Sequence, residues 1–447
     1  MNRHTAFLLA ALPLSLMAQP RAYTLDECRQ MARDNHPTAR NAALEVSSAR
    51  ERKGEALAEY FPTVKASAAA YHAFNPLISL SLVDIAGTSD AAWELQNRLE
   101  DYGNQNGVKT TFEALQYGYG ATLSAMQPVY AGGRIVNGNR LARLGVEAAE
   151  LQQEVKLQET DALTEEKFWQ VVSLTEKQGT ASEALSTLDS LLRYARSATG
   201  AGLITTTELL TLENKRDETA LAATRLRGSI RMAKMDLLNA MGADYTVTGV
   251  DSLTLLYPHD SLPAPEACYI PEEELAARMR ENRLLDLQAE AKELQKKMTI
   301  GETLPEIGIG AFYGYGKYLG DASANGAALV SVQVPLSDWG KAAHRIRRYA
   351  NDAEMARNDR DYLSAQLLLK ARQLWVTLST AYEELQVAAK TRDVSRDTYA
   401  KTAGQLEAGT VTMGDLLQAR LALRQADDAL TDARIAYRRA LSEYTRY

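Results

Sequence analysis

Two long stretches of the chain contain no proline, and this absence restricts the fold more than any other feature. They run from Val129 to Tyr257 and from Leu336 to Tyr447, and both are rich in Ala, Leu, Glu, Gln, Arg and Lys. These residues favour helices, whereas proline usually ends one. A helix over about Leu141–Ala198 would be roughly 90 Å long at 1.5 Å per residue, far longer than an average globular helix. The sequence therefore predicts very long helices.

A coiled-coil pattern runs through the second of these stretches. Seam positions follow one another there at alternating spacings of four and three residues. The predicted seam consists of Leu363, Leu367, Lys370, Leu374, Thr377, Ala381, Leu385 and Ala388. Many seam positions are filled by small residues, so the pattern predicts helices that approach one another closely.

The chain contains the same unit twice. Gly202 and Gly409 begin similar segments 207 residues apart, "GLITTTELL" and "GTVTMGDLL". Three residues after each glycine stands a threonine and six residues after it an acid, giving the equivalent residues Thr205, Thr412, Glu208 and Asp415. Because glycine adopts a helix-ending conformation without strain, we expect each glycine to end one long helix where the chain reverses into the next.

Other residues repeat at the same or a similar spacing. Pro128 and Pro335 are 207 residues apart, as are Gly133 and Gly340, and these four residues are the predicted strand–helix junctions. Pro62 and Pro305 are 243 residues apart, so the first copy contains about 36 extra residues between its two prolines. Each unit is thus a helix, two strands, a long helix, a turn and a long helix.

These equivalences define the predicted organisation of the chain. We expect a first repeat over 19–242, a linker or equatorial segment over 243–270, and a second repeat over 271–447. The predicted strands lie at about 62–74, 115–128, 305–318 and 326–335, and the helical hairpins turn near 202 and 409. In the extra segment, a helix should begin at Ser89 or Asp90, with Trp93 and Leu99 available for packing.

The predicted strands alternate between apolar and small or polar residues. In "PEIGIGAFYGYGKY" the odd positions, including Ile309, are apolar, whereas Gly308, Gly310 and Gly314 share the other face. Strands of about ten residues with one apolar face are typical of membrane β-barrels, and aromatic residues cluster at the strand ends, as at bilayer interfaces. A soluble four-stranded sheet packed on the helices is the alternative. In lipid such a sheet would have to close by association with other copies.

The N-terminal segment, the net charge and the absence of known motifs limit the location and the chemistry of the chain. Residues 1–18 have the basic start and apolar run of a secretory signal peptide. A formal net charge of −7 argues against a nucleic-acid partner. Cys28 and Cys268 either form one disulfide or are unrelated. The sequence contains no catalytic or phosphate-binding motif and no metal-ligand spacing of histidines, so we expect no catalytic residue, metal or cofactor, and no enzyme.

Taken in order, these motifs resemble the TolC-type outer membrane efflux family. The resemblance rests on "LDECRQMARDNHP" after the signal peptide, on Pro128 and Pro335, and on the two turns that begin at Gly202 and Gly409. It implies a homotrimer in outer membrane lipid, in which four strands per chain close a twelve-stranded barrel. The long helices would continue as a periplasmic tunnel. The chain would be a passive conduit for efflux or type I secretion.

The resemblance also implies roles for the turns. They would lie at the periplasmic tip, where Gly202, Thr205, Gly409 and Thr412 would contact a periplasmic adaptor, or membrane fusion protein, linked to an inner-membrane transporter. The family's gate positions are occupied here by Val411, where an arginine is common, and by Gln418, where an acid is common. In a trimer, Glu208 and Asp415 would form an acidic, cation-selective pore entrance.

Two alternatives remain open at this stage. Glu208 and Asp415 could be solvated acids in the first turn of a helix, a place that the helix dipole favours. The chain as a whole could be a soluble secreted helical rod or adhesin, in which the strands form a small cap.

Overall fold

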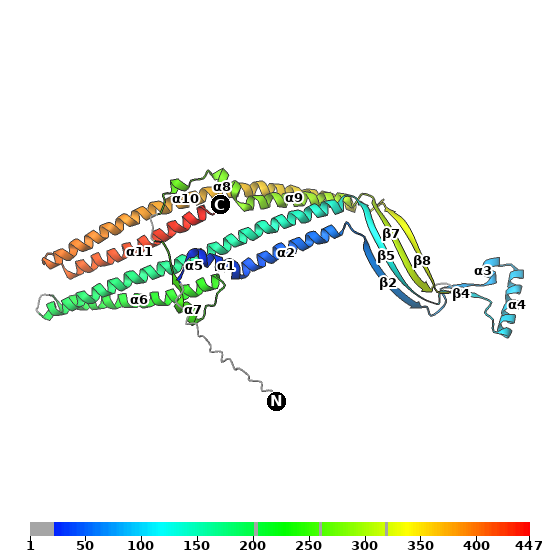
Figure 1. Cartoon of the computed structure of the whole chain (residues 1–447), viewed down its shortest axis with the longest axis horizontal. Coiled ribbons are helices and arrows are strands. Elements are labelled where there is room, and N and C mark those ends of the chain that lie inside the picture. The colour runs from blue at the N-terminus through cyan, green and yellow to red at the C-terminus, as the bar shows by residue number, and fades with distance from the viewer. Residues whose placement is uncertain (1–21, 201–203, 259–261, 318–320) are drawn as a thin grey trace, which may run out of the picture. The chain divides into compact units, whose positions relative to one another are not determined.

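The protein, seen here in a computed structural model, consists mainly of long helices and one antiparallel sheet (Figure 1). The structure describes residues 22–200, 204–258, 262–317 and 321–447. The predicted signal peptide and Gly202 therefore lie outside the described residues. The main helices are α1 (Leu25–Asn35), α2 (Pro37–Ala58), α5 (Arg134–Gly200), α6 (Thr206–Ala240), α9 (Arg280–Gly301), α10 (Lys341–Glu407) and α11 (Met413–Tyr444).

The chain divides into two compact units that do not coincide with the two sequence repeats. The first unit contains the described residues up to Ser48 together with Glu147–Leu287 and Asn358–Tyr447. The second contains Ala49–Val146 and Gln288–Arg357. Each repeat contributes its helical hairpin to the first unit and its strands to the second.

The two longest helices are equivalent residue for residue. Helices α5 and α10 contain 67 residues each, and both ends of α10 lie 207 positions after the ends of α5. At 1.5 Å per residue each helix rises by about 100 Å along its axis. The helix expected over Leu141–Ala198 is thus present and begins earlier, directly after the strand–helix junction.

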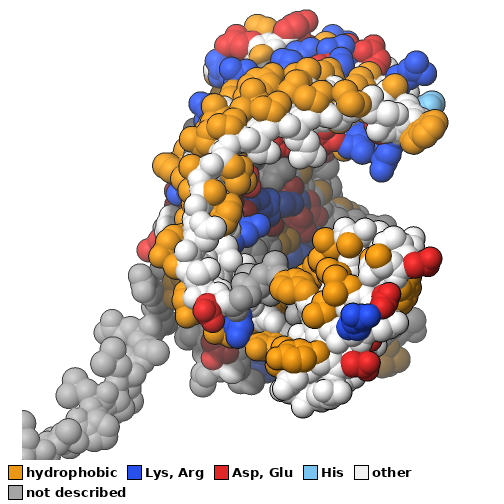
Figure 2. Space-filling view, turned by 90° about the vertical axis from the view of Figure 1, so that its right-hand side faces the viewer, with side chains coloured by type: hydrophobic (Ala, Val, Ile, Leu, Met, Phe, Trp, Pro, Cys, Tyr) orange, Lys and Arg blue, Asp and Glu red, His pale blue; other side chains and the backbone are white. Residues whose placement is uncertain are grey.

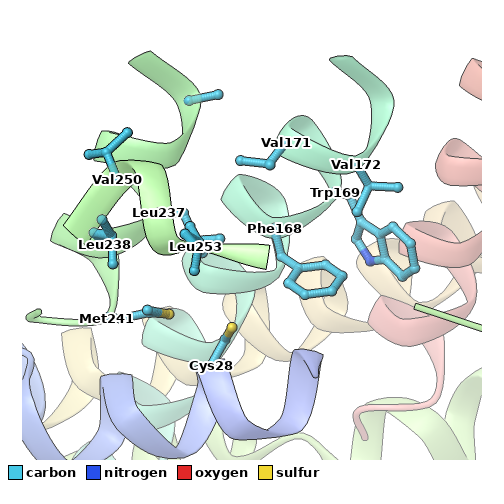
Figure 3. Close-up of a cluster of buried hydrophobic side chains, with 11 residues drawn as sticks. Cys28, Phe168, Trp169, Val171, Val172, Leu237, Leu238, Met241, Val250 and Leu253 are labelled. Atoms are coloured by element: carbon cyan, nitrogen blue, oxygen red, sulfur yellow. The ribbon is translucent and has the colours of Figure 1, made fainter. Parts of the chain in front are cut away.

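The first unit has a separate core for each repeat. In the first core, α1, α5 and α6 bury Cys28, Phe168 and Leu237 (Figure 3). In the second core, α8 (Glu272–Arg278) joins α10 and α11 around Leu275, Leu378 and Tyr444. Leu237 and Tyr444 are both fully buried and 207 residues apart, so the two halves fill the same position with different side chains.

The coiled-coil seam predicted on α10 is displaced by one residue in part of its length. Ala371, Leu374, Leu378 and Ala381 are buried, whereas Thr377 is exposed. Lys370 lies beside the seam, where its Nζ donates to Tyr447 Oη at 2.9 Å. The apolar contacts therefore come from Ala371 and Leu378, and the prediction of Lys370 and Thr377 was wrong.

The cysteines of the first unit are not bonded to each other. Cys28 is fully buried among Leu237, Leu238 and Met241, and this burial raises the pKa of its thiol to about 12. A thiol with so high a pKa remains protonated and unreactive at neutral pH, which is the behaviour of a structural residue.

The second unit contains a four-stranded antiparallel sheet in the order β2–β5–β7–β8. Its strands are β2 (Thr63–His72), β5 (Tyr117–Ala131), β7 (Glu306–Lys317) and β8 (Ser323–Gln333). The two hairpins β2–β5 and β7–β8 are joined in the middle by pairing of β5 with β7. Among the described residues, one side of β2 and one side of β8 are unpaired edges.

The extra segment of the first repeat forms a small structure of its own. Two short strands, β3 (Ile78–Leu80) and β4 (Phe112–Ala114), pair with each other and flank α3 (Leu82–Ala86) and α4 (Asp90–Asn106). Ser89 caps α4, as the sequence predicts. Packing differs from the prediction, because Trp93 and Leu99 are 51% and 39% exposed while Ala92 and Gln96 are buried.

Candidate functional site: an apolar sheet face and two helical turns

One face of the sheet is apolar on all four strands. Residues that oppose one another across antiparallel strands share a face, so the registers assign every side chain to one side. The apolar face carries Val64, Ala66, Ala68, Ala70, Tyr119, Ala121, Leu123, Ala125, Ile309, Ala311, Tyr313, Tyr315, Ala328, Val330 and Val332, and its polar members are His72, Gln127 and Lys317. No layer of described residues covers these side chains: Ile309 is 49% exposed and Val330 is 71% exposed.

The opposite face of the sheet is built mainly from small and polar residues. It carries Lys65, Ser67, Gly120, Thr122, Ser124, Gly308, Gly310, Gly314, Asn325 and Ser331, with Met126, Phe312 and Leu329 as larger apolar residues. Figure 2 views the chain from the end with the sheet and shows a curved band of hydrophobic side chains. The apolar face therefore requires a partner or an apolar solvent, whereas the other face tolerates water.

No helix among the described residues is long and apolar enough to cross a membrane.

The turn between α10 and α11 is fixed at both ends by local hydrogen bonds. Gly409 has a φ of 71°, a left-handed conformation in which a side chain would be strained. Its N–H donates to the carbonyl oxygen of Leu406 at 2.9 Å, which ends α10. Thr412 then caps α11, because its Oγ1 accepts the N–H of Asp415 while the Asp415 carboxylate accepts the Thr412 N–H at 2.9 Å.

The first hairpin uses the same device. Thr205 caps α6, and the Glu208 carboxylate accepts the Thr205 N–H and hydroxyl, both at 2.9 Å. In both turns these hydrogen bonds to threonine lower the pKa of the acid, so Glu208 and Asp415 are carboxylates at neutral pH. Each acid is thus hydrogen-bonded to the threonine that caps its own helix.

The two turns lie at the same end of the first unit. Leu417, near the start of α11, packs with Leu212, near the start of α6, and with Leu188 and Leu192, near the end of α5. The remaining predicted gate residues lie beside them: Val411 is half-buried before the cap, and Gln418 is exposed on α11. The structure thus brings Glu208, Asp415, Val411 and Gln418 to one region, and no ion pair joins the two turns among the residues that the structure describes there.

The strand–helix junctions of the second unit are also equivalent in conformation. Two consecutive residues have positive φ at each junction: Gly132 and Gly133 in the first repeat, Trp339 and Gly340 in the second. Pro128 stands at an irregularity in the β5–β7 ladder, where a residue without an N–H is tolerated. Pro335 lies beyond the end of β8.

Comparison with known proteins identifies the second half of the chain. Residues 278–445 match the family described as outer membrane efflux protein. This match covers less than half of the chain. A search of the curated proteins finds no significant match to the sequence.

Solved outer membrane proteins share the fold of the matched segment and of the preceding repeat. VceC from Vibrio cholerae superposes with a TM-score of 0.74 at 15% identity, over 94% of this chain and 95% of VceC. A membrane protein from Pseudomonas aeruginosa gives 0.75 at 14% identity, over 94% and 92%. The Campylobacter jejuni CmeC outer membrane channel gives 0.74 at 14% identity, over 94% and 84%.

A buried charge cluster that the sequence analysis does not predict joins α1, α5 and the C-terminal residues. Glu165 of α5 is 4% exposed and accepts hydrogen bonds from Arg29 at 2.9 Å and from Ser442 at 2.8 Å. Arg446 contributes a third contact at 3.3 Å. One helical turn away, Arg33 Nε donates to Asp161 at 2.9 Å. The sequence does contain a signal for this cluster. Two arginines are four residues apart on α1, and two acids are four residues apart on α5, so each pair lies on one face of its helix.

Proposed function

We propose that this protein is an outer membrane channel that forms the last, passive stage of an efflux or type I secretion system. The observation that carries the proposal is the continuous apolar face of the sheet, which runs over four strands from both repeats. The family match over 278–445 supports the same function. A soluble rod or adhesin would leave this face in water, so the structure offers no support for that alternative.

In this proposal the channel is a homotrimer. Within the described residues, the β2 and β8 edges are unpaired, and a membrane sheet cannot keep unpaired edges in lipid. Three copies would supply twelve strands, enough for one barrel whose outer surface is the apolar face. The small and polar face, with its glycines, would then line the lumen.

The helical turns form the periplasmic tip in this proposal. Thr205 and Thr412, with the adjoining glycines, would contact the adaptor that connects the channel to an inner-membrane transporter. Glu208 and Asp415 would place carboxylates at the entrance, and their low pKa keeps them charged at periplasmic pH. Since Val411 and Gln418 provide no charge, closure at this tip would rely on packing of apolar residues rather than on an ion pair.

The segment with α3 and α4 lies outside the cell in this proposal, because it connects two strands at the end of the sheet away from the helices (Figure 1). A protease added to intact cells should cut between Asn75 and Glu113. Cutting that occurs only after the cells are lysed would contradict this orientation.

The experiment that tests the function is purification from the outer membrane in detergent. A trimeric channel should run as a large band on an unheated gel, collapse to one chain on boiling, and conduct ions in a planar bilayer. Deletion of the gene should raise the sensitivity of the cell to exported compounds. A monomer recovered from the soluble periplasmic fraction would overturn the proposal.

A further inference from the structure

A cavity of about 380 Å³ lies beside the strand–helix junction of the second unit. Its wall comes from the end of α2, the start of α5, the end of α9 and the adjoining parts of β5 and β7. Apolar side chains form one part of this wall, including Pro128, Ile135 and Met298. Ligand pockets have volumes of about 300–1,000 Å³. The cavity is therefore large enough for a small organic molecule, and its wall fits one with an apolar body.

The charged groups of the wall are mostly acids. Three glutamates line the cavity, Glu59, Glu302 and Glu306, together with one cation, Arg134. Arg134 is paired with Glu306 at 2.7 Å, and Arg345, which is not part of the wall, is paired with Glu302. Glu59 is exposed, and no cation among the described residues pairs with it. The cavity therefore has one carboxylate without a counter-charge.

A second acceptor of the wall is also unused. Asn139 is 9% exposed, and its Nδ2 donates to the carbonyl oxygens of Ala56 at 2.6 Å and Ile135 at 3.0 Å. Both amide hydrogens are thereby occupied, which fixes the orientation of the amide. Its Oδ1 accepts no hydrogen bond from any residue that the structure describes. Because Asn139 lines the cavity, this oxygen is available to a ligand that carries N–H groups.

The second repeat shows what the first repeat lacks. Glu59 and Glu302 are 243 residues apart, and Gly138 and Arg345 are 207 residues apart, which are the two spacings of the repeat. Glu302 and Arg345 form an ion pair, whereas their equivalents Glu59 and Gly138 both line the cavity. The first repeat thus keeps the carboxylate and has no side chain in place of the guanidinium.

We propose that the cavity binds an organic cation with an apolar body and a guanidinium or ammonium head, in place of the arginine side chain that the first repeat lacks. The head donates hydrogen bonds to the Glu59 carboxylate and to Asn139 Oδ1, while the body packs against Ile135 and Met298. Water and salt screen the attraction because Glu59 is exposed, so binding is weak and reversible. Weak binding is compatible with passage of the cation through a conduit.

The side of the sheet on which the cavity lies indicates where the cation comes from. Pro128 opposes Gly308 on the small and polar face, and Glu306 stands two residues before Gly308 on the same strand. Both wall residues therefore project to this face. In the proposed function this face lines the lumen, so the cation belongs to the exported material and not to the bilayer. The source of the cation rests on the proposed function, whereas the chemistry of the site does not.

Binding to the purified full-length protein in detergent tests the site. The probe is phenethylguanidinium, whose head resembles that of arginine, and isothermal titration calorimetry measures its dissociation constant. We expect one site per chain. Phenethylurea has nearly the same shape without the charge and should bind about tenfold more weakly, the effect of one hydrogen bond to a charged group. Equal binding of the two compounds would contradict recognition of a cation.

Gly138→Arg places the ion pair of the second repeat inside the cavity. An added Cβ at Gly138 would lie 3.7 Å from Met298 Cε, an ordinary contact, so the helix should accept the arginine. Its side chain should fill the site and raise the dissociation constant of the probe about tenfold or more. Gly145→Arg adds the same charge on α5 outside the cavity, with no atom near the added Cβ, and should bind the probe normally. Equal weakening by both substitutions would overturn the proposal.

Glu59→Gln tests the carboxylate with little change of shape. It should raise the dissociation constant of the probe by about threefold to tenfold, because an exposed charge contributes less than a buried one. Glu55→Gln removes a charge one turn earlier on α2, from an exposed residue that does not line the cavity, and should leave binding unchanged. Unchanged binding in the Glu59 variant would show that this acid does not hold the cation.

The outcomes separate the site from the function. Heat-dissociable trimers that conduct ions but do not bind the probe would overturn the site and leave the channel intact. Soluble monomers that bind the probe would contradict the proposed function and retain the site. In nanodiscs, competition with the probe by phosphatidylethanolamine but not by phosphatidylglycerol would show that a lipid ammonium occupies the cavity, which would overturn the lumenal source.

Discussion

Arg29 Nη2 lies 2.9 Å from Glu165 Oε2, and this contact joins the first helix of the chain to the middle of α5. Both side chains are largely buried, at 24% and 6% exposure, and Ser442 and Arg446 reach the same carboxylate from the end of α11. Both ends of the described chain thus converge on one acid. Loss of the acid would leave two arginines without their buried counter-charge.

Glu165→Gln should therefore destabilise the protein by about 3–5 kcal/mol, the usual effect of removing one partner of a buried ion pair. Unfolding in detergent, followed by helical circular dichroism, measures the change. The control is Glu94→Gln, which removes an exposed partner of Arg98 and should cost about 1 kcal/mol or less. Equal effects of the two substitutions would show that the buried cluster contributes little.

Replacement of Gly409 tests the turn at the start of α11. Gly409→Val should still give a folded protein in the outer membrane, because the strain at its φ of 71° is local and about 1–2 kcal/mol. The displaced tip should fail to support efflux with its adaptor, measured as drug susceptibility. Gly404→Ala, in the interior of α10 with open space around the added methyl, should leave efflux unchanged. Normal efflux by the Gly409 variant would argue against a docking role for this turn.

Charge at the turns should influence ion selectivity. Asp415→Asn keeps an oxygen that can accept the Thr412 N–H while removing the charge, so assembly should survive and the cation preference of a single channel should fall. The reversal potential in a salt gradient reports this preference. If it is unchanged in Asp415→Asn and also in the double variant with Glu208→Gln, these acids do not line the entrance.

The same acids give a pH dependence with a defined sign. Hydrogen bonds to Thr205 lower the pKa of Glu208 below 4.5, the value for an unperturbed glutamate, so the folded state binds protons less readily than the unfolded state. The stabilisation of the helix start is therefore complete above pH 4.5 and is lost as the pH falls through the lowered value. Cation preference should likewise persist from neutral pH to about pH 5 and decline only in stronger acid.

Adjacent positions on β7 test which face of the sheet contacts lipid. Ile309→Arg should impair trimer assembly more than Gly308→Arg, because an arginine on the lipid face at mid-depth costs roughly 2–4 kcal/mol. Unheated gels of outer membrane extracts compare the two variants directly. Equal assembly would mean that the apolar face does not contact the lipid.

The close approach of two glycines at the strand–helix junction predicts a sensitive site. Gly301→Ala would place its Cβ 2.4 Å from the Gly132 carbonyl oxygen, so the backbone must shift, at a cost of about 1–3 kcal/mol. Gly145→Ala, within α5 and with no atom near the added methyl, should instead stabilise the helix by up to about 1 kcal/mol. A lower thermal midpoint only for the first variant would confirm the contact.

The sequence predicts best those features that a few adjacent residues determine. The helix end at Gly409 and the start at Thr412 follow from a glycine, a threonine and an acid at fixed spacing, and the structure contains all three contacts. The alternation along β7 likewise identifies its two faces, because a strand turns each side chain by about 180°.

Features that depend on distant partners could not be predicted in this way. A spacing of four and three fits two stripes one residue apart, so the pattern predicts Lys370 at the seam where the structure buries Ala371. Glu165 stands in a run of polar residues that is typical of a solvated helix face, and only packing against α1 and α11 gives it a different role. Trp93 is exposed because α3 covers a different side of α4.

The equal length of α5 and α10 limits how a chain of this kind can change during evolution. A deletion of one residue in either 67-residue helix would rotate everything beyond it by 100° and shorten it by 1.5 Å. Its turn would then no longer match the turn of the other hairpin, and the buried stripe would face the wrong way. A length change of seven residues keeps each stripe nearly aligned, but it must occur in both helices. After duplication of the unit, therefore, a change in the length of one long helix requires the same change in the other.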